Sequence, residues 1–271
     1  MNQTSFQAIL LDRILSHQLP LQLPEEFVHP YYNGASILNI PASIVKQLTG
    51  TSFGEGPLLP EIESQLFSRQ YQHIALLLVD GLGYDWLYEH LAREAHEEPA
   101  LRFWHQILSG AVISPLTSIA PSTTAAALST FWTGRPPATH GVLGYEVWLK
   151  ELGILSNMIL HSPAPARGAI GSIYPAGFDP ETFISVDLIG EHLQRHGVET
   201  RSFQHQSIVN SGLSTMLDQG AQRLPYKTIT DMWFHFEENL YANRSTPSYN
   251  WLYWGDHDGL AHRYGADHPR L

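Results

Sequence analysis

The sequence predicts an α/β protein with a largely parallel central sheet. The main observation is a continuous apolar run, residues 73–79, that ends in Asp80-Gly81. Such a run is typical of a strand buried on both faces, as in a parallel sheet covered by helices. Residues 199–206 and 249–254 also have the pattern of strands, and helical patterns lie between these segments. Alternation of strands and helices favours a layered α/β architecture.

The segment before the first strand is predicted to be helical and rich in loops. Thr4 and Gln7 have the spacing of a capping box, and a first helix is expected to run to about Gln18. Pro41 fits the first turn of a second helix that ends at Gly50. The stretch that follows is rich in glycine and proline, so we expect a loop there over residues 50–60.

The spacing of apolar residues places the remaining helices. They are expected at residues 84–97, 124–132, 186–196 and 228–241, with an extended segment at 112–120. No repeat or low-complexity linker divides the chain, so residues 1–271 are interpreted as one domain. Within it, residues 1–70 are expected to form a helical extension packed on a core of residues 72–271.

Composition excludes several classes of protein. The 271 residues are 43% hydrophobic and 15% charged, which fits a globular chain rather than a disordered one. The net charge is −11, and no basic run is present that would bind a nucleic acid. With no visible targeting signal or membrane-spanning run, a cytoplasmic location without membrane contact is expected. Because cysteine is absent and histidine is abundant, a zinc site would use His and carboxylate ligands.

Residues suited to chemistry stand at the ends of the extended segments, where α/β sheets bind their ligands. Asp80 follows the first strand, although an Asp before a Gly is also an ordinary turn. Ser122-Thr123-Thr124 precedes a helix of small residues. A hydroxyl at that position meets free N–H groups and the positive end of the helix dipole, which favours a phosphoryl group. A plain N-cap is the alternative.

The third place is a polar stretch after the last predicted strand, residues 256–262. Asp258 and His262 are four residues apart, so on one helical turn they face the same way and can hold one metal ion. Asp256 and His257 are neighbouring candidates, and a polar loop without a ligand is the alternative.

Taken in order, these pieces resemble the alkaline phosphatase superfamily, and most closely its type I phosphodiesterase/nucleotide pyrophosphatase branch. The resemblance covers about residues 72–265 and is carried by Asp80-Gly81, Thr124 nine residues before Thr133-Gly134, His140-Gly141, and Asp258-x-x-x-His262-x-x-Gly265. It implies a three-layer α/β/α fold that holds two zinc ions. It also implies hydrolysis of phosphate esters, namely phosphodiester or nucleotide pyrophosphate bonds, through a phospho-threonine.

The resemblance also assigns roles to individual residues. Asp80 and Thr124 would be ligands of one zinc ion, with Thr124 as the nucleophile, and Asp258 and His262 would be ligands of the other. The two hydroxyl residues before Thr124 compete with it as nucleophile, and the family spacing to the Thr-Gly pair favours Thr124. The partner of such a site would be a small phosphate ester.

Several positions depart from the family pattern. Three alanines follow Thr124 where phosphodiesterases of this type carry Pro-Asn-His, and Tyr145 stands where an Asn often follows the His-Gly pair. Tyr145 is therefore the candidate for a hydrogen bond to the substrate. Trp148 and Phe178 are candidate walls of a leaving-group pocket, with ordinary core packing as the alternative.

The largest departure is at the end of the chain. The family's later Asp-His pair and final His have no counterpart after His262, since Asp267-His268 lies too close to it. The resemblance thus leaves each zinc site short of ligands, and we expect a truncation at Leu271 with C-terminal strands missing. The two hypotheses are a metal-dependent phosphoryl-transfer hydrolase and an incomplete, inactive domain of the same family. A mutase or sulfatase is disfavoured, because a sulfatase nucleophile is a modified Cys or Ser in its own motif.

Overall fold

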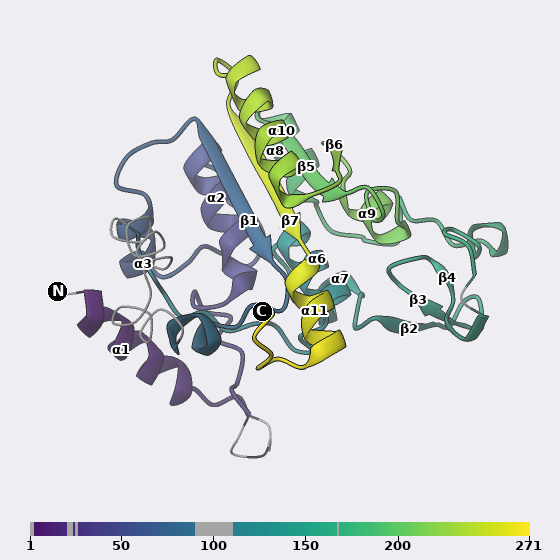
Figure 1. Cartoon of the computed structure of the whole chain (residues 1–271), viewed down its shortest axis with the longest axis horizontal. Helices are drawn as coiled ribbons and strands as arrows, with labels where there is room; N and C mark the ends of the chain where they lie inside the picture. Colours follow the sequence, from purple (N-terminus) through teal and green to yellow (C-terminus); the bar gives the residue numbers. More distant parts are fainter. Residues whose placement is uncertain (1–2, 21–23, 25–26, 90–110, 167) are drawn as a thin grey trace.

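The computed structural model describes residues 3–20, 24, 27–89, 111–166 and 168–271. At its centre is a parallel sheet with the order β1-β7-β5-β6. The strands are β1 (His73–Val79), β5 (Glu199–His205), β6 (Ala221–Tyr226) and β7 (Ser248–Trp254). Helices lie on both faces of this sheet (Figure 1), so the predicted layered α/β fold with a parallel sheet is confirmed.

One face of the sheet packs against a group of helices through the aromatic side chains of β7. These helices are α2 (Ile40–Thr49), α6 (Thr124–Thr133), α8 (Ile189–Arg195) and α9 (Gly212–Leu217). Tyr249, Trp251 and Tyr253 alternate along β7 and therefore point to this same face. The Trp251 ring centroid lies 5.4 Å from that of Phe131 and 5.9 Å from that of Trp132, both on α6. This packing fixes α6 against the centre of the sheet.

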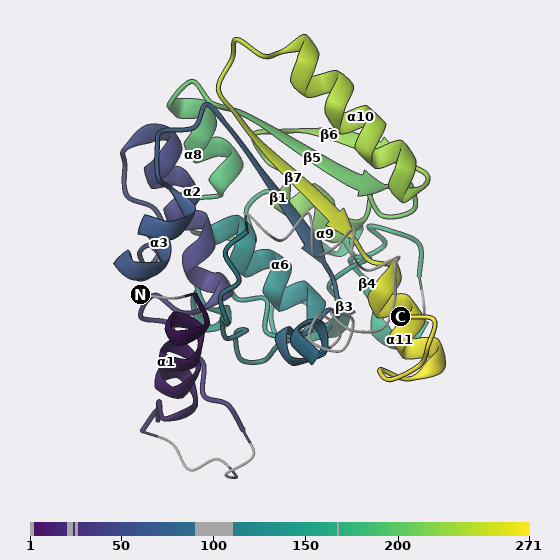
Figure 2. The same ribbon diagram turned by 60° about the vertical axis from the view of Figure 1, so that its left-hand side comes forward.

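The opposite face is covered by α10 (Ile229–Ala242), which lies across β5, β6 and β7 (Figure 2). Phe203 and Leu252 from the sheet pack with Met232 from the helix, and all three are fully buried. The Thr228 hydroxyl accepts a hydrogen bond from the Asp231 N–H at 3.1 Å and caps α10 at its predicted start.

The N-terminal part consists of α1 (Gln3–Leu15), the short 3₁₀ helix η1 (Ile37–Asn39), α2 and α3 (Pro60–Leu66). The prediction for α2 is confirmed, since Pro41 lies in its first turn and Gly50 ends it with φ 73°. The capping box was wrong, because Thr4 lies inside α1 and the Gln7 side chain donates to the Ile113 carbonyl at 2.9 Å. The loop after Gly50 is confirmed as far as α3, which the sequence did not predict.

A small antiparallel sheet was also not predicted. Its order is β2-β3-β4, from β2 (Glu146–Leu149), β3 (Ile154–Asn157) and β4 (Ser162–Pro163). The remaining elements are the helices α7 (Pro137–His140) and α11 (Asp256–Tyr264) and the 3₁₀ turns η2 (Ala164–Ala166) and η3 (Tyr174–Ala176). None of the described helices is long and apolar enough to span a bilayer.

Three expectations differ from the structure. In the described part of the chain β1 pairs only with β7, so it is an edge strand, and Leu77 is 37% exposed instead of buried. The segment at 112–120 forms no strand but a single bridge between Ser36 and Thr117. Of the helix expected at 84–97, residues 84–89 are helical, and the rest falls outside the described residues.

Candidate active site

The carboxyl ends of β1 and β7 meet at one edge of the central sheet, where α6 begins. The two strands are parallel, with Leu78 opposite Tyr253. Asp80 extends their ladder by one residue, because its N–H donates to the carbonyl oxygen of Trp254 at 3.0 Å. The structure therefore places the residue after β1 beside the residues after β7, as expected for ligand-binding edges of parallel sheets.

Thr124, the first residue of α6, faces Asp80. Its hydroxyl donates to the Asp80 Oδ2 atom at 3.3 Å. Thr123 is the N-cap of the helix, and its hydroxyl accepts from the Ala126 N–H at 3.5 Å, while Ser122 is exposed to solvent. Among these three hydroxyl residues, Thr124 is the one that contacts the carboxylate, and it also stands at the positive end of the helix dipole.

Asp258 and His262 lie on one side of α11, which begins directly after β7. The His262 Nε2 atom is 3.6 Å from the Asp258 Oδ2 atom, so the predicted pairing on one helical turn is confirmed. Gly81 makes room for this helix. It has φ 75°, and a Cβ atom there would lie 3.0 Å from the Asp258 Cα atom. A glycine is needed at this turn both for its backbone conformation and for the close approach of α11.

Two carboxylates face each other across this turn. Burial raises the pKa of Asp258 above its ordinary value, and the negative charge of Asp80 raises it further, whereas His262 and His257 act in the opposite direction. A bound cation would relieve the repulsion between the carboxylates. The oxygen and nitrogen donors present suit zinc in kind. They stand in two pairs, Asp80 with Thr124 and Asp258 with His262. No group of three or more His, Asp or Glu ligands that could hold a metal ion gathers among the described residues.

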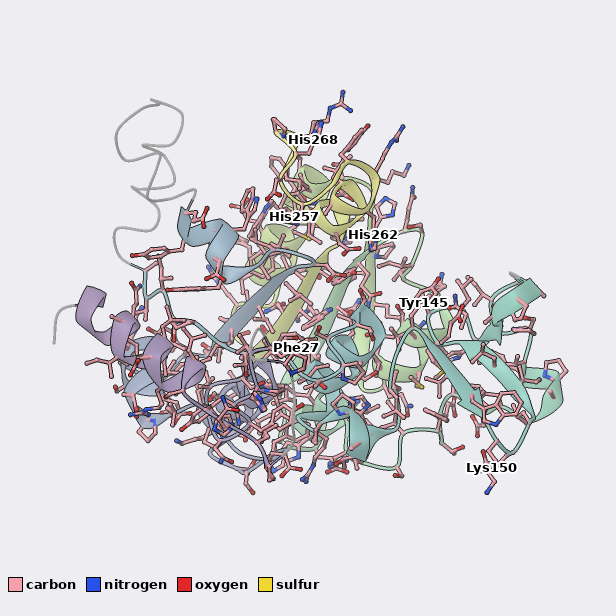
Figure 3. All side chains as sticks on the ribbon, turned by 90° about the horizontal axis from the view of Figure 1, so that it is seen from below. Phe27, Tyr145, Lys150, His257, His262 and His268 are labelled. Atoms are coloured by element: carbon pink, nitrogen blue, oxygen red, sulfur yellow. The ribbon has the colours of Figure 1, made fainter. Side chains whose placement is uncertain are left out.

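Asp256 and His257, the competing candidates, are engaged elsewhere. Asp256 accepts a hydrogen bond from the Trp254 indole N–H at 3.0 Å. The His257 ring meets the Trp86 ring edge-on, with 5.5 Å between centroids, and its two buried nitrogens have no hydrogen-bond partner among the described residues. Figure 3 shows His257 and His262 on different sides of α11, as expected for residues five apart on a helix.

The other two motif pieces lie at the far end of α6. Gly134 ends this helix with φ 61°. The buried His140 on α7 is 3.1 Å from the Thr130 hydroxyl through Nε2, and its Nδ1 accepts from the Val142 N–H at 3.2 Å. Burial lowers the pKa of His140 to about 4, so the ring is neutral near pH 7. The Thr-Gly and His-Gly pairs therefore anchor α6 and do not reach Asp80.

The candidate substrate contacts have different surroundings. Tyr145, between α7 and β2 (Figure 3), and Trp148, on β2, are 50% and 60% exposed and are accessible to a ligand. Phe178 is buried in the main core, with its ring 4.7 Å from that of His161. Phe178 therefore packs in the core, which was the alternative to a wall of the leaving-group pocket.

Tyr253 is a further residue of this site, and it was not among the residues predicted from the sequence. Its hydroxyl donates to the same Asp80 Oδ2 atom at 2.6 Å, a shorter contact than that of Thr124. A signal was present in the alternation along β7, because it places Tyr253 on the α6 face at the carboxyl end of the strand. The sequence alone does not show that β7 pairs with β1.

A cavity of about 80 Å³ lies behind Thr124, between α6, α9 and β7. Thr124, Tyr253, Asp218 and Gln204 are among the residues that line it.

Asp218, which lines this cavity, should make the free energy of unfolding depend on pH. Burial raises its pKa to about 7, against the effects of Arg223 and of hydrogen bonds from Ser202 and Gln204. The folded protein keeps this proton to about pH 7, whereas the unfolded carboxyl ionises near pH 4. Between these values the unfolded chain binds fewer protons, so this group lowers the free energy of unfolding as pH rises.

Replacing Asp218 by Asn, which mimics the protonated acid, should therefore raise the Tm by roughly 5 °C at pH 8 and change it little near pH 4. Thermal melts across this pH range check the prediction. Asp12→Asn, at an exposed position on α1, is the control and should show no such trend. A constant difference between Asp218→Asn and wild type at all pH values would contradict the prediction.

The family model of type I phosphodiesterase/nucleotide pyrophosphatase matches residues 74–271, which include β1 from its second residue and the whole of α6, β7 and α11. Comparisons with curated proteins and with solved structures gave no match. The family match extends from the first strand of the sheet to the last residue and contains all the residues of the candidate site. The chain therefore belongs to the type I phosphodiesterase/nucleotide pyrophosphatase family, consistent with the alkaline phosphatase superfamily.

Proposed function

We propose that the chain is a zinc-dependent hydrolase of small phosphate esters with Thr124 as its nucleophile. The family indicates hydrolysis of phosphate esters in general. The observation that carries the finer proposal is the 3.3 Å contact between the Thr124 hydroxyl and Asp80, beside the Asp258–His262 pair. A hydroxyl at a helix start and two acidic residues at one sheet edge suit phosphoryl transfer.

The donor pairs define how the site would hold its metal. Asp80 and Thr124 would bind one zinc ion, and Asp258 and His262 would bind the other. When bound, zinc supplies Lewis acidity, which lowers the pKa of a coordinated hydroxyl and neutralises charge on the phosphoryl oxygens.

The chain's own residues carry the transfer. The Thr124 Oγ1 atom attacks phosphorus, and an O–P bond forms as the bond to the leaving oxygen breaks. The hydroxyl proton of Thr124 leaves in the same step and ends on the leaving oxygen. The N–H groups at the start of α6 face the negative charge of the phosphoryl group. Water then hydrolyses the phospho-threonine, which releases phosphate or its monoester and restores the Thr124 hydroxyl. Tyr145, which is half-exposed, is the candidate for a hydrogen bond to the substrate.

The test is hydrolysis of bis(p-nitrophenyl) phosphate and p-nitrophenyl phosphate with added zinc. We expect turnover that disappears after dialysis against a chelator and returns with zinc. Turnover that survives chelation would refute metal dependence. The comparison of the two substrates shows whether the site prefers a diester or a monoester.

A second reading is a domain of this family without activity. It is favoured by one observation, namely that the described residues supply metal donors in pairs and not in larger groups. Metal analysis of the purified chain separates the two readings. Two tightly held zinc ions per chain would refute the inactive domain, and zinc-free protein without turnover at saturating zinc would support it.

A further inference from the structure

Two hydroxyl groups converge on a single oxygen of Asp80. The Tyr253 hydroxyl donates to Oδ2 at 2.6 Å, and the Thr124 hydroxyl donates to the same atom at 3.3 Å. Among the described residues, the Asp80 side chain accepts these two hydrogen bonds. One oxygen of the carboxylate is therefore saturated by donors, while Oδ1 keeps its lone pairs for another partner.

Tyr253 is itself held in place from three sides. Tyr253 is buried, with 8% of its surface exposed, and it lines the cavity behind Thr124. Its carbonyl oxygen accepts a 2.6 Å hydrogen bond from the Tyr226 hydroxyl on β6. Gly255 leaves just enough space for the hydroxyl, since a Cβ atom there would lie 3.2 Å from the Tyr253 oxygen. These contacts, and not the hydrogen bond to Asp80, therefore hold the Tyr253 hydroxyl in place.

We propose that Tyr253 is a positioning residue that fixes the Asp80 carboxylate, turning Oδ1 toward a metal ion and Oδ2 toward the Thr124 hydroxyl. This role rests on the proposed zinc site. The physical reason is that hydrogen bonds to a ligating carboxylate restrict its rotation before the metal binds, so less conformational entropy is lost on binding. Loss of such a contact usually weakens metal binding by about 10- to 100-fold.

The experiment compares zinc affinity in the full chain, measured by competition with a chromophoric chelator. Tyr253→Phe removes the hydroxyl and should weaken zinc binding by about 10-fold or more. Gly255→Ala keeps the hydroxyl but displaces it, and should weaken binding in the same direction. Residue 255 has φ −98°, which alanine adopts without strain. Tyr249→Phe is the matched control, because Tyr249 is buried on the same strand and face but lies four residues from Tyr253.

Turnover separates positioning from chemistry. In Tyr253→Phe the lost turnover should return at saturating zinc, whereas in Thr124→Ala it should not. The proposal is overturned if Tyr253→Phe binds zinc as tightly as wild type, if Tyr249→Phe weakens binding equally, or if the wild-type chain binds no zinc. If Tyr253→Phe weakens zinc binding but Thr124→Ala leaves turnover unchanged, the positioning role stands and the proposed nucleophile fails.

Discussion

Thr124→Ala is expected to reduce zinc-dependent hydrolysis of a phosphodiester by at least about a thousandfold. The variant removes the proposed attacking atom, and neither of the two hydroxyl residues that precede it in the chain is placed to replace it. Thr123 uses its hydroxyl to cap α6, and Ser122 lies in solvent. Because Ala125 and Ala126 are fully buried, the start of α6 cannot shift to bring another residue toward Asp80 without disturbing the core.

The measurement is initial-rate hydrolysis together with labelling by a substrate that carries radioactive phosphorus. A phosphorylated peptide that contains Thr124 should be trapped by acid quenching of wild type and should be absent from the variant. Thr123→Ala is the control. It removes an N-cap, so the free energy of unfolding should fall by about 1 kcal/mol while turnover persists. Label on Thr123 or Ser122, or full activity of Thr124→Ala, would contradict the assignment.

The main elements of the fold could be predicted from the sequence because their signals are local. The apolar run of β1, the caps of α2 and α10, and the aromatic alternation of β7 each depend on a few neighbouring residues. The elements that were missed have weak local signals. The strands β2 and β3 are four residues long, and β6 contains Pro225, which usually excludes a central strand. Because β6 lies at the end of the described sheet, a proline is tolerated there.

The candidate site was predictable as a set of residues but not as a network. Order and spacing were enough to select Asp80, Thr124, Asp258 and His262, and the structure brings the first two into contact and pairs the last two. Tyr253 could not be found in this way, because its role depends on the long-range pairing of β7 with β1. Order and spacing also grouped His140 with these site residues as part of one set of motifs. In the structure the buried His140 ring instead anchors α6.

Asp80→Asn is expected to have opposite effects on activity and on the stability of the metal-free protein. The asparagine has the same shape, and its oxygen can accept the hydrogen bonds from Tyr253 and Thr124, so the fold should be preserved. Removing the negative charge ends the repulsion that helps to raise the pKa of Asp258. We therefore expect the metal-free variant to melt roughly 1 to 3 °C above wild type.

Zinc should reverse this order. If the proposed site binds zinc, wild type should gain stability from a ligand that binds only the folded state, whereas the variant lacks an anionic ligand and should gain little. Turnover of Asp80→Asn should fall by at least about a hundredfold for the same reason. Thermal melts with and without zinc test whether the order of the two Tm values reverses. Asp85→Asn, which alters an exposed acid on the next turn, is the control and should change neither the order of the Tm values nor the turnover. If zinc stabilised Asp80→Asn as strongly as wild type, Asp80 would not be a metal ligand. The residual pair of Asp258 and His262 would then be the only part of the proposed metal site still supported.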